Sequence, residues 1–506
     1  MRVSNRRIGW AVAMAATVLA ALVACGGGSV GTNGTGSPVL VGLDVGTVSG
    51  LGSVIVDGTR HDDSAAHTEV RRNATDVEVG DVRLGHRVSL EFGTDAAGAQ
   101  VLQRIELLPS VSGRVSERTG DTIGVLGQTV TVNTEPARGP VTAFEAPLNS
   151  LADLRLGDAV DVHALTQRTG AGPADVRLVA TRITRRSALP EVRVSGTVAA
   201  LSAAGSGGAR SFRLGALTVE LPASATLQPQ GIALLDGRAV TVFAAESAFD
   251  PATLVLGASA VQVMSVGTVA SGGSSAATTL RRAGLVGAWT GTSFDLDGVG
   301  LLVRADTQIV SAGQPLGDGA YVQATAVLDS SGRWQATRIE RLGTASAGAE
   351  LRGTLDGWSS TAGTFRVRDT VVTLAPTAQI DLAACRVPSL VDGLYVDVKG
   401  TSTAQGLTAS TVACSPEPAG TKSRLERHGL VLTADTVARK LTMRRQPGDA
   451  VLTVTWSAPL YLGESLTVAS LAALAGTPSQ IEVEGTLSAD GLQMVARKIK
   501  LRTSGH

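Results

Sequence analysis

A four-residue element, Ala-x-x-Ile or Ala-x-x-Val, recurs along the chain at a nearly constant interval. The first copy has Leu in place of Ala, and the closing Ile or Val stands at positions 105, 183, 261, 339, 412 and 499. The successive intervals are 78, 78, 78, 73 and 87 residues. Such regularity over 506 residues indicates tandem duplication of one module, which excludes a single large irregular domain.

A second element, Gly-x-x-Val-x-apolar, precedes each closing residue. Pro478 takes the place of its glycine in the sixth copy, and the other five copies have Gly85, Gly157, Gly237, Gly319 and Gly393. A Gly-x-apolar step opens several copies, at Gly46, Gly113, Gly196 and Gly353. These shared positions divide each copy into the same short segments.

Apolar residues alternate with polar ones inside each copy, as at Ile123 and Val125 followed by Val130 and Val132. Alternation at period two, broken by Gly or Asp, is typical of half-buried antiparallel strands. Each copy therefore holds five or six strands, and the only helix expected is a short Ala/Leu stretch near 470–475. Because such strands must hide their edges and one apolar face, we predict an all-β tandem array of small antiparallel barrels, OB-like or SH3-like. The alternative is a continuous β-solenoid, which uses shorter repeats.

The predicted organisation has a signal peptide, a linker and six β repeats. The signal peptide is 1–24 and the lipid-anchored Gly/Ser-rich linker is 25–43. The β repeats are 44–109, 110–187, 191–266, 267–343, 350–415 and 423–502. A module of this size is only marginally stable alone, so contacts between neighbouring repeats are expected.

The first 25 residues have the pattern of a bacterial export signal. Arg2, Arg6 and Arg7 precede an apolar stretch at 8–24 that ends in Leu-Val-Ala before Cys25. A positive region followed by a short apolar segment is typical of a secretory signal. The Leu-Val-Ala-Cys sequence resembles the lipobox of bacterial lipoproteins, which implies cleavage before Cys25 and its lipidation. An ordinary cleaved signal with a chance cysteine is the alternative.

Lipidation of Cys25 predicts a protein anchored to a membrane by acyl chains rather than spanning it. In the lipoprotein family, a residue other than Asp after the cysteine, here Gly26, implies the outer membrane. The Gly-rich segment 26–38 is typical of a flexible tether. It contains a Gly-x-Ser-x-Gly match at Ser29, but a nucleophile elbow needs a flanking strand and helix that a Gly/Ser tether does not supply.

The charge of the chain bears on whether it binds nucleic acid, and its cysteine content bears on whether it forms a disulfide. Lys and Arg total 44, as do Asp and Glu, and cleavage of the signal removes three arginines. A slightly acidic mature chain is not expected to bind nucleic acid.

Cys385 and Cys414 are the only thiols left after lipidation, and we predict a disulfide between them in an oxidising compartment. Two buried free thiols are the alternative.

The opening of the first copy carries a family resemblance. Residues 46–58 read GTVSGLGSVIVDG, followed later by Leu84-Gly85 and Val88. This segment resembles the domain-of-unknown-function family DUF5666, whose copies often start G-x-V-x-G-F-G-S; here Leu51 replaces Phe. The later copies match only the looser framework. The resemblance implies exported tandem β domains on bacterial lipoproteins, and it brings no known activity or catalytic residues.

No catalytic, cofactor or metal site is predicted. His61, Asp62, Asp63 and His67 form the densest group of metal-ligand side chains, but they occur in one copy without zinc-site spacing. A polar hairpin loop after Asp57 explains this group better. His86, His163 and His428 share no spacing, and no Walker sequence is present.

Three classes of function remain. The first, which we favour, is a non-enzymatic structural or partner-binding protein of the bacterial envelope, with an envelope protein or polysaccharide as partner. The second is oligosaccharide or single-stranded nucleic-acid binding on OB-like faces, which would use exposed aromatic rings. The third is an enzyme such as a hydrolase, which no sequence feature supports. A solvent-facing row made by Trp289, Trp334, Trp358 and Trp456 would favour glycan binding.

Overall fold

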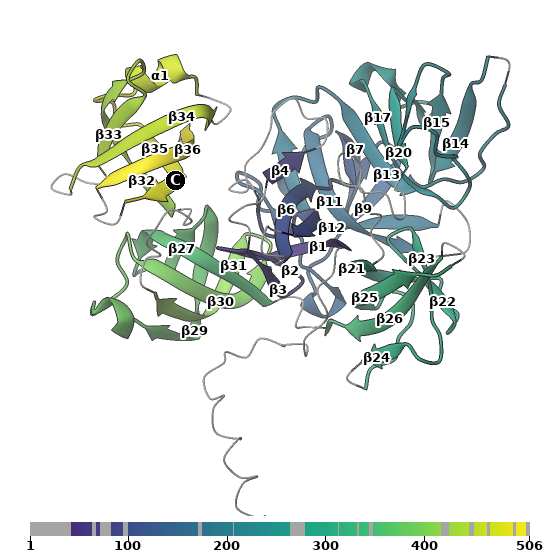
Figure 1. Cartoon of the computed structure of the whole chain (residues 1–506), viewed down its shortest axis with the longest axis horizontal. Helices are drawn as coiled ribbons and strands as arrows, with labels where there is room; N and C mark the ends of the chain where they lie inside the picture. The colour runs from purple at the N-terminus through teal and green to yellow at the C-terminus, as the bar shows by residue number, and fades with distance from the viewer. Residues whose placement is uncertain are drawn as a thin grey trace, which may run out of the picture. The chain divides into compact units, whose positions relative to one another are not determined.

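Strands make up most of the described residues in the computed structural model (Figure 1). The structure describes residues 42–62, 67–70, 82–94, 100–168, 170, 175–205, 207–263, 279–311, 313–330, 333–343, 348–415, 425–444, 450–462, 466–488 and 492–501. The predicted signal peptide, Cys25 and Ser29 lie outside these residues. Within these ranges no helix has the length and apolar character that a membrane span requires.

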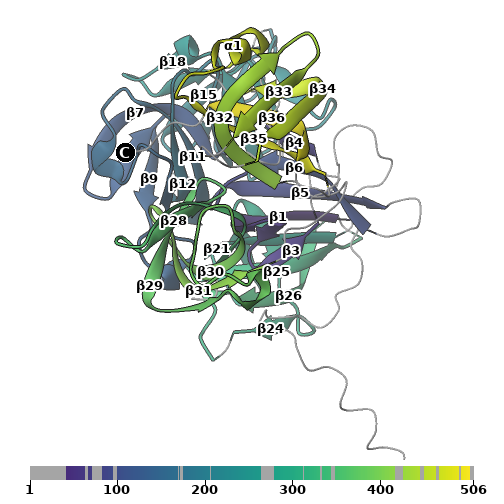
Figure 2. The same ribbon diagram turned by 90° about the vertical axis from the view of Figure 1, so that its left-hand side faces the viewer.

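The sixth repeat shows the barrel in its simplest form (Figure 2). Its elements are β32 (Leu425–Asp435), β33 (Lys440–Arg444), β34 (Leu452–Leu462), α1 (Val468–Ala473), β35 (Gln480–Leu487) and β36 (Gln493–Leu501). The strands close in the order β32-β33-β34-β36-β35. Only β34 and β36 are parallel, and α1 lies between the third and fourth strands in sequence. This order closes an OB-like barrel without a free edge.

The second repeat has the same strand order, with β7 and β12 in the roles of first and last strand. Its elements are β7 (Val111–Thr119), β8 (Thr122–Val125), β9 (Gln128–Val132), η2 (Pro136–Arg138), β10 (Ala143–Phe144), η3 (Leu151–Asp153), β11 (Ala159–Arg168) and β12 (Val176–Arg186). β9 and β12 are parallel, and β11 pairs with β7 to close the barrel.

The fourth and fifth repeats follow the same plan. The fourth comprises β21 (Thr279–Gly287), β22 (Ser293–Leu296), β23 (Val299–Leu302), β24 (Gln308–Val310), β25 (Tyr321–Leu328) and β26 (Trp334–Arg341). The fifth comprises β27 (Gly348–Ser359), β28 (Thr364–Val367), β29 (Thr370–Asp381), η6 (Ala383–Cys385), β30 (Tyr395–Thr403) and β31 (Gly406–Cys414). In repeat 4, β25 pairs with β21, and β26 runs parallel to β23 and β24. In repeat 5, β30 pairs with β27, and β31 runs parallel to β29.

In the first and third repeats the middle strands are divided into shorter strands. The first comprises β1 (Gly42–Leu51), β2 (Val54–Val56), β3 (Thr59–His61), β4 (His67–Val70), β5 (Arg87–Thr94) and β6 (Gln100–Leu107). The third comprises β13 (Val192–Thr197), β14 (Arg210–Leu214), β15 (Leu217–Leu221), β16 (Thr226–Gln228), β17 (Ala239–Ala244), η4 (Glu246–Ala248), β18 (Phe249–Asp250), β19 (Val255–Gly257) and β20 (Ala260–Val263). The prediction of an all-β chain of small antiparallel barrels is confirmed, and a β-solenoid is excluded for the described residues.

The Ala-x-x-Ile element lies on the last strand of five repeats, where it contains a β-bulge. In the third repeat it begins at Ala258, in the connection between β19 and β20. In the second repeat, Ala164 pairs with Ala180 and His163 with Arg182, so Thr181 is the extra residue. Residues three apart on a regular strand face opposite sides of the sheet. The bulge lets both Ala180 and Ile183 point into the core, where both are fully buried.

The two glycine elements meet in each barrel. Gly85 N donates to Val48 O at 2.9 Å, and Val48 N donates to His86 O at 2.9 Å. Four later repeats have the equivalent pair of hydrogen bonds, and every glycine of this element has positive φ. In the sixth repeat the donor to Val431 O is Gly476, with φ +75°. The prediction that Pro478 takes this position is wrong, because the connection after α1 turns two residues earlier.

Strands of different repeats also pair. β1 runs parallel to β21 at Leu43 and Leu280, and parallel to β27 at Leu51 and Leu351. One buried apolar cluster spans repeats 2 and 3, and another spans repeats 1 and 5. In these four repeats the apolar interior is therefore shared between two barrels. Merged cores bury more apolar surface than barrels of this size achieve alone.

Candidate functional site

Two-residue turns between the second and third strands bring polar side chains to the junctions between repeats. Asp57-Gly58 and Asp297-Gly298 form such turns, with φ +48° at Asp57 and +52° at Asp297. Asp and Gly tolerate the left-handed conformation that these hairpin turns require. A glycine inside the first strand leaves room for the turn, since a Cβ at Gly284 of β21 would lie 3.1 Å from Asp297 Oδ2. The local sequence thus places each Asp at a barrel surface.

Asp297 connects three repeats. The Arg87 guanidinium of repeat 1 donates from Nη2 to Asp297 Oδ2 at 2.5 Å. The backbone N–H of Thr166, in repeat 2, donates to Asp297 Oδ1 at 2.8 Å. Arg282 of repeat 4 donates to the Asp297 carbonyl oxygen at 3.0 Å. The side chains of Arg87 and Asp297 are 4% and 7% exposed, so this ion pair is almost completely buried from solvent.

The other donors of Arg87 are also used. Its Nη1 donates to Thr47 Oγ1 at 3.2 Å and to the Ala283 carbonyl at 3.0 Å. Its backbone N–H donates to His163 Nδ1 at 3.1 Å. A buried charge is tolerated when its hydrogen bonds are satisfied in this way. Arg87 therefore ties the first repeat to both the second and the fourth.

Asp57 and Tyr321 form the second contact of this junction. The Tyr321 hydroxyl donates to Asp57 Oδ1 at 2.6 Å, and Thr47 N donates to Oδ2 at 3.0 Å. Burial raises the pKa of Asp57 to about 6, although the Arg87 charge and the Tyr321 hydrogen bond oppose the shift. Burial and the Asp57 carboxylate raise the pKa of Tyr321 well above its ordinary value. Tyr321 therefore stays a neutral donor.

His86 and His163 stack at the junction of repeats 1 and 2. Their ring centroids are 4.5 Å apart, and both side chains are buried. Burial and the Arg182 charge lower the pKa of His163 to about 3. Burial, with the neighbouring His163, lowers the pKa of His86. Both rings are neutral at neutral pH, and the Arg83 N–H donates to His86 Nδ1 at 3.1 Å.

Arg182 and Glu145 lie beside the histidine pair. Arg182 Nη2 donates to Glu145 Oε2 at 2.6 Å, and its Nη1 donates to the Leu84 carbonyl at 3.1 Å. Burial alone would raise the pKa of Glu145, but the Arg182 charge and hydrogen bond outweigh it and lower the pKa to about 2. Thr181 adds a 2.6 Å hydrogen bond to the Gly85 carbonyl across the same junction.

The turn of repeat 5 makes a similar junction. Asp369 accepts from Arg83 Nη2 at 3.1 Å and from Lys500 Nζ of repeat 6. Burial opposes its ionisation, but the Arg83 and Lys500 charges lower the pKa of Asp369 below its usual range. Lys500 also lies 2.9 Å from Glu482. The corresponding turn of repeat 5, Arg368-Asp369, therefore connects repeats 1, 5 and 6 through its second residue.

The junction groups are engaged with one another, which suits them to holding repeats together. A shallow pocket lies elsewhere, between repeats 2 and 3, and Asp161, Arg186, Arg193 and Phe243 line it. Arg186 lies 3.3 Å from Asp161, and the Arg193 guanidinium lies 5.5 Å from the centre of the Phe243 ring. The first contact lies within repeat 2 and the second within repeat 3, so side chains of both repeats line the pocket.

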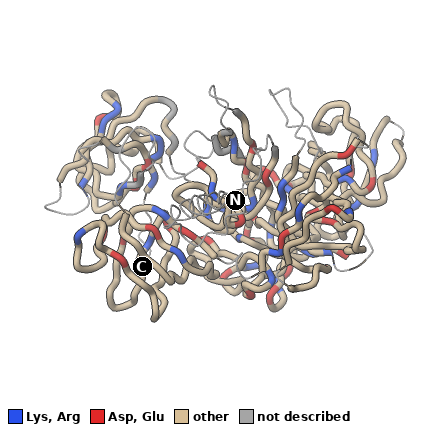
Figure 3. The backbone as a smooth tube through the Cα atoms, turned by 60° about the horizontal axis from the view of Figure 1, so that its bottom comes forward, with Lys and Arg blue, Asp and Glu red and all other residues tan. Residues whose placement is uncertain are grey.

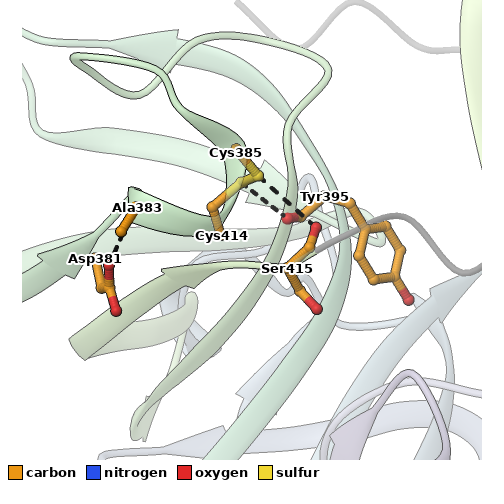
Figure 4. Close-up of a disulfide and its surroundings, with 6 residues drawn as sticks. All are labelled: Asp381, Ala383, Cys385, Tyr395, Cys414 and Ser415. Atoms are coloured by element: carbon orange, nitrogen blue, oxygen red, sulfur yellow. Dashed lines mark hydrogen bonds between the residues drawn. A yellow bond between two sulfur atoms is a disulfide. The ribbon is translucent and has the colours of Figure 1, made fainter.

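Cys385 and Cys414 are bonded to each other in repeat 5 (Figure 4). Their Cα atoms are 5.9 Å apart, which is ordinary for a disulfide. Cys385 ends η6 and Cys414 ends β31, so the bond fastens the connection between the third and fourth strands to the last strand. Of the predicted site residues, Cys25 lies outside the described residues.

The histidine-rich group of repeat 1 is only partly described. His61 Nε2 lies 3.5 Å from Asp44, and its ring centroid lies 5.2 Å from that of Phe92. Asp63 and the His67 side chain lie outside the description. In the described part of the chain, no three metal-ligand side chains come together.

The four tryptophans do not form an exposed row. Trp334 and Trp456 are 5% and 7% exposed and belong to the cores of repeats 4 and 6. Trp289 and Trp358 are half-buried and lie against core phenylalanines, with ring centroids 5.6 Å and 6.0 Å away. Their indoles contribute to packing and are not arranged as a stacking platform.

Sequence reasoning missed the junction residues Arg87, Asp297, Tyr321 and Arg182. Asp57-Gly58 was read only as a hairpin break, although Asp297-Gly298 repeats it at the same place in the fourth copy. That recurrence was the available signal. The partners of these turns lie on other repeats, so no local pattern identifies them.

The comparisons with known proteins agree with a repeated β domain. The family model DUF5666, "Domain of unknown function", matches residues 112–184, 283–340 and 352–413. No curated protein matches the chain. A solved structure described as "drosophila Unr CSD456" is 12% identical, covering 37% of this chain and 77% of that chain with a TM-score of 0.12. A TM-score this low does not establish a shared fold. The chain is thus similar to this family in three separate segments, which is consistent with a repeated domain.

Proposed function

We propose that this protein is a non-enzymatic, lipid-anchored scaffold of the bacterial cell envelope with a structural or partner-binding role. The observation that carries the proposal is the sequence Leu-Val-Ala-Cys25 at the end of an apolar segment that follows Arg6 and Arg7. That combination is typical of a lipoprotein export signal. The acyl chains are expected to insert into the outer membrane. The β repeats would then lie either in the periplasm or on the cell surface.

The junctions support the structural part of the proposal. Arg87, Arg182 and Tyr321 are buried, and the Asp297 side chain is 7% exposed. The polar groups of these residues make hydrogen bonds to other repeats, as does the Asp57 carboxylate. Groups that are paired in this way hold modules in one arrangement rather than act on a substrate. The Cys385–Cys414 disulfide is consistent with an oxidising compartment.

Labelling with radioactive palmitate tests the anchor. The wild-type chain is expected to take up label in a bacterium that processes lipoproteins, and Cys25→Ala is expected to lose it. Absence of label on the wild type would overturn the lipid anchor. Protease treatment of intact cells then separates an outward-facing array, which is cut, from a periplasmic one, which is protected.

A further inference from the structure

The turn between the second and third strands is covered in several repeats but free in the sixth. In repeat 2, Gln128 beside this turn donates to the Leu214 carbonyl of repeat 3 at 3.0 Å. In repeat 6, Val437 of the turn is 94% exposed. Among the described residues, no residue outside repeat 6 makes a hydrogen bond or ion pair with residues 430–444. The sixth barrel therefore leaves this side of its sheet open.

The open side carries a regular set of polar side chains. On β33, Leu441 and Met443 are buried, so Lys440, Thr442 and Arg444 alternate with them and face outward. Thr442 lies opposite Thr433 of β32 and Thr453 of β34, and Lys440 lies opposite Thr455. We name the open face by these residues: Thr433, Arg439, Lys440, Thr442, Arg444, Thr453 and Thr455.

The open face has an excess of positive charge. Residues 423–502 contain ten Lys and Arg against seven Asp and Glu, whereas the mature chain as a whole is slightly acidic. Figure 3 marks the Lys, Arg, Asp and Glu of the described residues along the backbone. Lys500 of the same barrel is paired with Glu482 at 2.9 Å. Arg439, Lys440 and Arg444 form no ion pair with a described carboxylate. Asp435 lies opposite Lys440, but its Oδ1 accepts the N–H groups of Val437 and Ala438, at 3.0 Å and 2.8 Å.

We propose that the open face binds an anionic polysaccharide. The three cations fit carboxylate or phosphate groups, and the threonine hydroxyls fit sugar hydroxyls. The face extends over β32, β33 and β34, which suits a polymer better than a single ion. Single-stranded nucleic acid would need an exposed aromatic ring to stack on, whereas Trp456 is buried in this barrel. This inference deepens the proposed binding role and rests on it.

The test is a binding titration of the purified full chain with polygalacturonate at two salt concentrations. Neutral dextran and a single-stranded oligothymidylate are the comparison ligands. The variant R439Q/K440Q/R444Q removes the positive charge of the open face. The control R155Q/R177Q/R210Q removes three exposed arginines of repeats 2 and 3, none of which is in an ion pair with a described carboxylate. Unfolding curves of both variants check that the barrels stay folded.

Polygalacturonate is expected to bind, more weakly at high salt, while dextran does not. The open-face variant should lose about fivefold to tenfold in affinity, because each exposed charge contact contributes only modestly. The control variant should bind like the wild type. Equal loss in both variants, no binding to polygalacturonate, or tighter binding of the oligothymidylate would each overturn the proposal. The titration contains no membrane, so its failure is separate from failure of palmitate labelling at Cys25.

Discussion

Asp297 accepts a 2.5 Å hydrogen bond from Arg87, whose position in the sequence is 210 residues earlier. The two residues belong to repeats 4 and 1, and both side chains are buried. The same carboxylate also accepts the Thr166 N–H of repeat 2 at 2.8 Å. A single turn residue therefore holds three repeats in register.

Asp297→Ala should destabilise the chain strongly, because it leaves the Arg87 charge buried without its carboxylate. Breaking a buried ion pair from one side costs about 3–5 kcal/mol. Chemical denaturation of the full chain measures the change. Arg138→Ala is the control, since the Arg138–Glu135 pair is 71% and 57% exposed. Its cost should be about 0.5 kcal/mol or less, and an equal cost for both variants would contradict the junction.

Gly85→Ala should cost more than Gly157→Ala, although the two glycines hold the same position in neighbouring repeats. Their φ angles are +82° and +85°, so each substitution carries a similar backbone strain of about 1–2 kcal/mol. A Cβ at Gly85 would also collide with the Thr181 carbonyl oxygen of repeat 2, whereas no atom lies within 4 Å of a Cβ at Gly157. The extra cost, about 1–3 kcal/mol, measures the closeness of the junction. Thermal unfolding of both variants gives the comparison, and equal values would show that the repeats are not in contact there.

Reduction of the Cys385–Cys414 bond should lower the stability of repeat 5. The bond closes a loop with a sequence separation of 29, for which chain entropy predicts about 3–4 kcal/mol. Unfolding with and without a reductant measures this difference. A C385S/C414S chain serves as the control, because its unfolding should not respond to the reductant. A response equal to that of the wild type would point to another cause.

Stability should fall as the pH drops below about 6.5, the ordinary value of a histidine pKa. The folded state holds His163 neutral down to a pKa of about 3, whereas the unfolded chain takes up the proton earlier. Protonation of His163 therefore favours the unfolded state between these values, and the contribution of this residue to the loss is on the order of 2 kcal/mol by pH 5. Unfolding curves at a series of pH values measure the slope.

His163→Gln should flatten the decrease of stability with falling pH.

Asp57 changes the pH dependence of stability in the opposite direction, because its folded pKa of about 6 lies above its ordinary value of 3.8. The stability that its protonated form contributes is present at low pH and is lost as the pH rises through 6. Asp57→Asn should therefore steepen the dependence between pH 4 and 6. A flatter curve for Asp57→Asn would contradict the assignment.

Several parts of the fold were readable from the sequence because their physical basis is local. The alternation around Ile123 and Val130 depends only on neighbouring residues, and β8 and β9 form there. Gly284-Leu285-Val286 and Gly429-Leu430-Val431 complete the opening step in repeats 4 and 6, yet sequence reasoning overlooked both. Their role is visible in the structure, where the Val286 and Val431 carbonyl oxygens accept hydrogen bonds from the N–H groups of Gly319 and Gly476.

The candidate site was less readable. In the sequence, the charged residues Arg87, Arg182 and Asp297 look like ordinary surface residues of strands and turns, and only the burial of their side chains against other repeats sets them apart. The disulfide cysteines were found because only two thiols remain after Cys25 is set aside. The face of repeat 6 is open because no other repeat covers its turn. No sequence pattern shows which turns are covered by other repeats.

By itself, the sequence determined the repeat length, the strand-rich character and the apolar interior positions, since these follow from periodicities of two residues and of about 78. The tertiary structure alone decided which repeats meet. Many Val-rich strand edges in this chain are chemically alike, so β1 could pair with any of them. The choice of β21 and β27 depends on shape and on distant partners such as Arg87 and Asp297, whose contact exists only after the chain has folded.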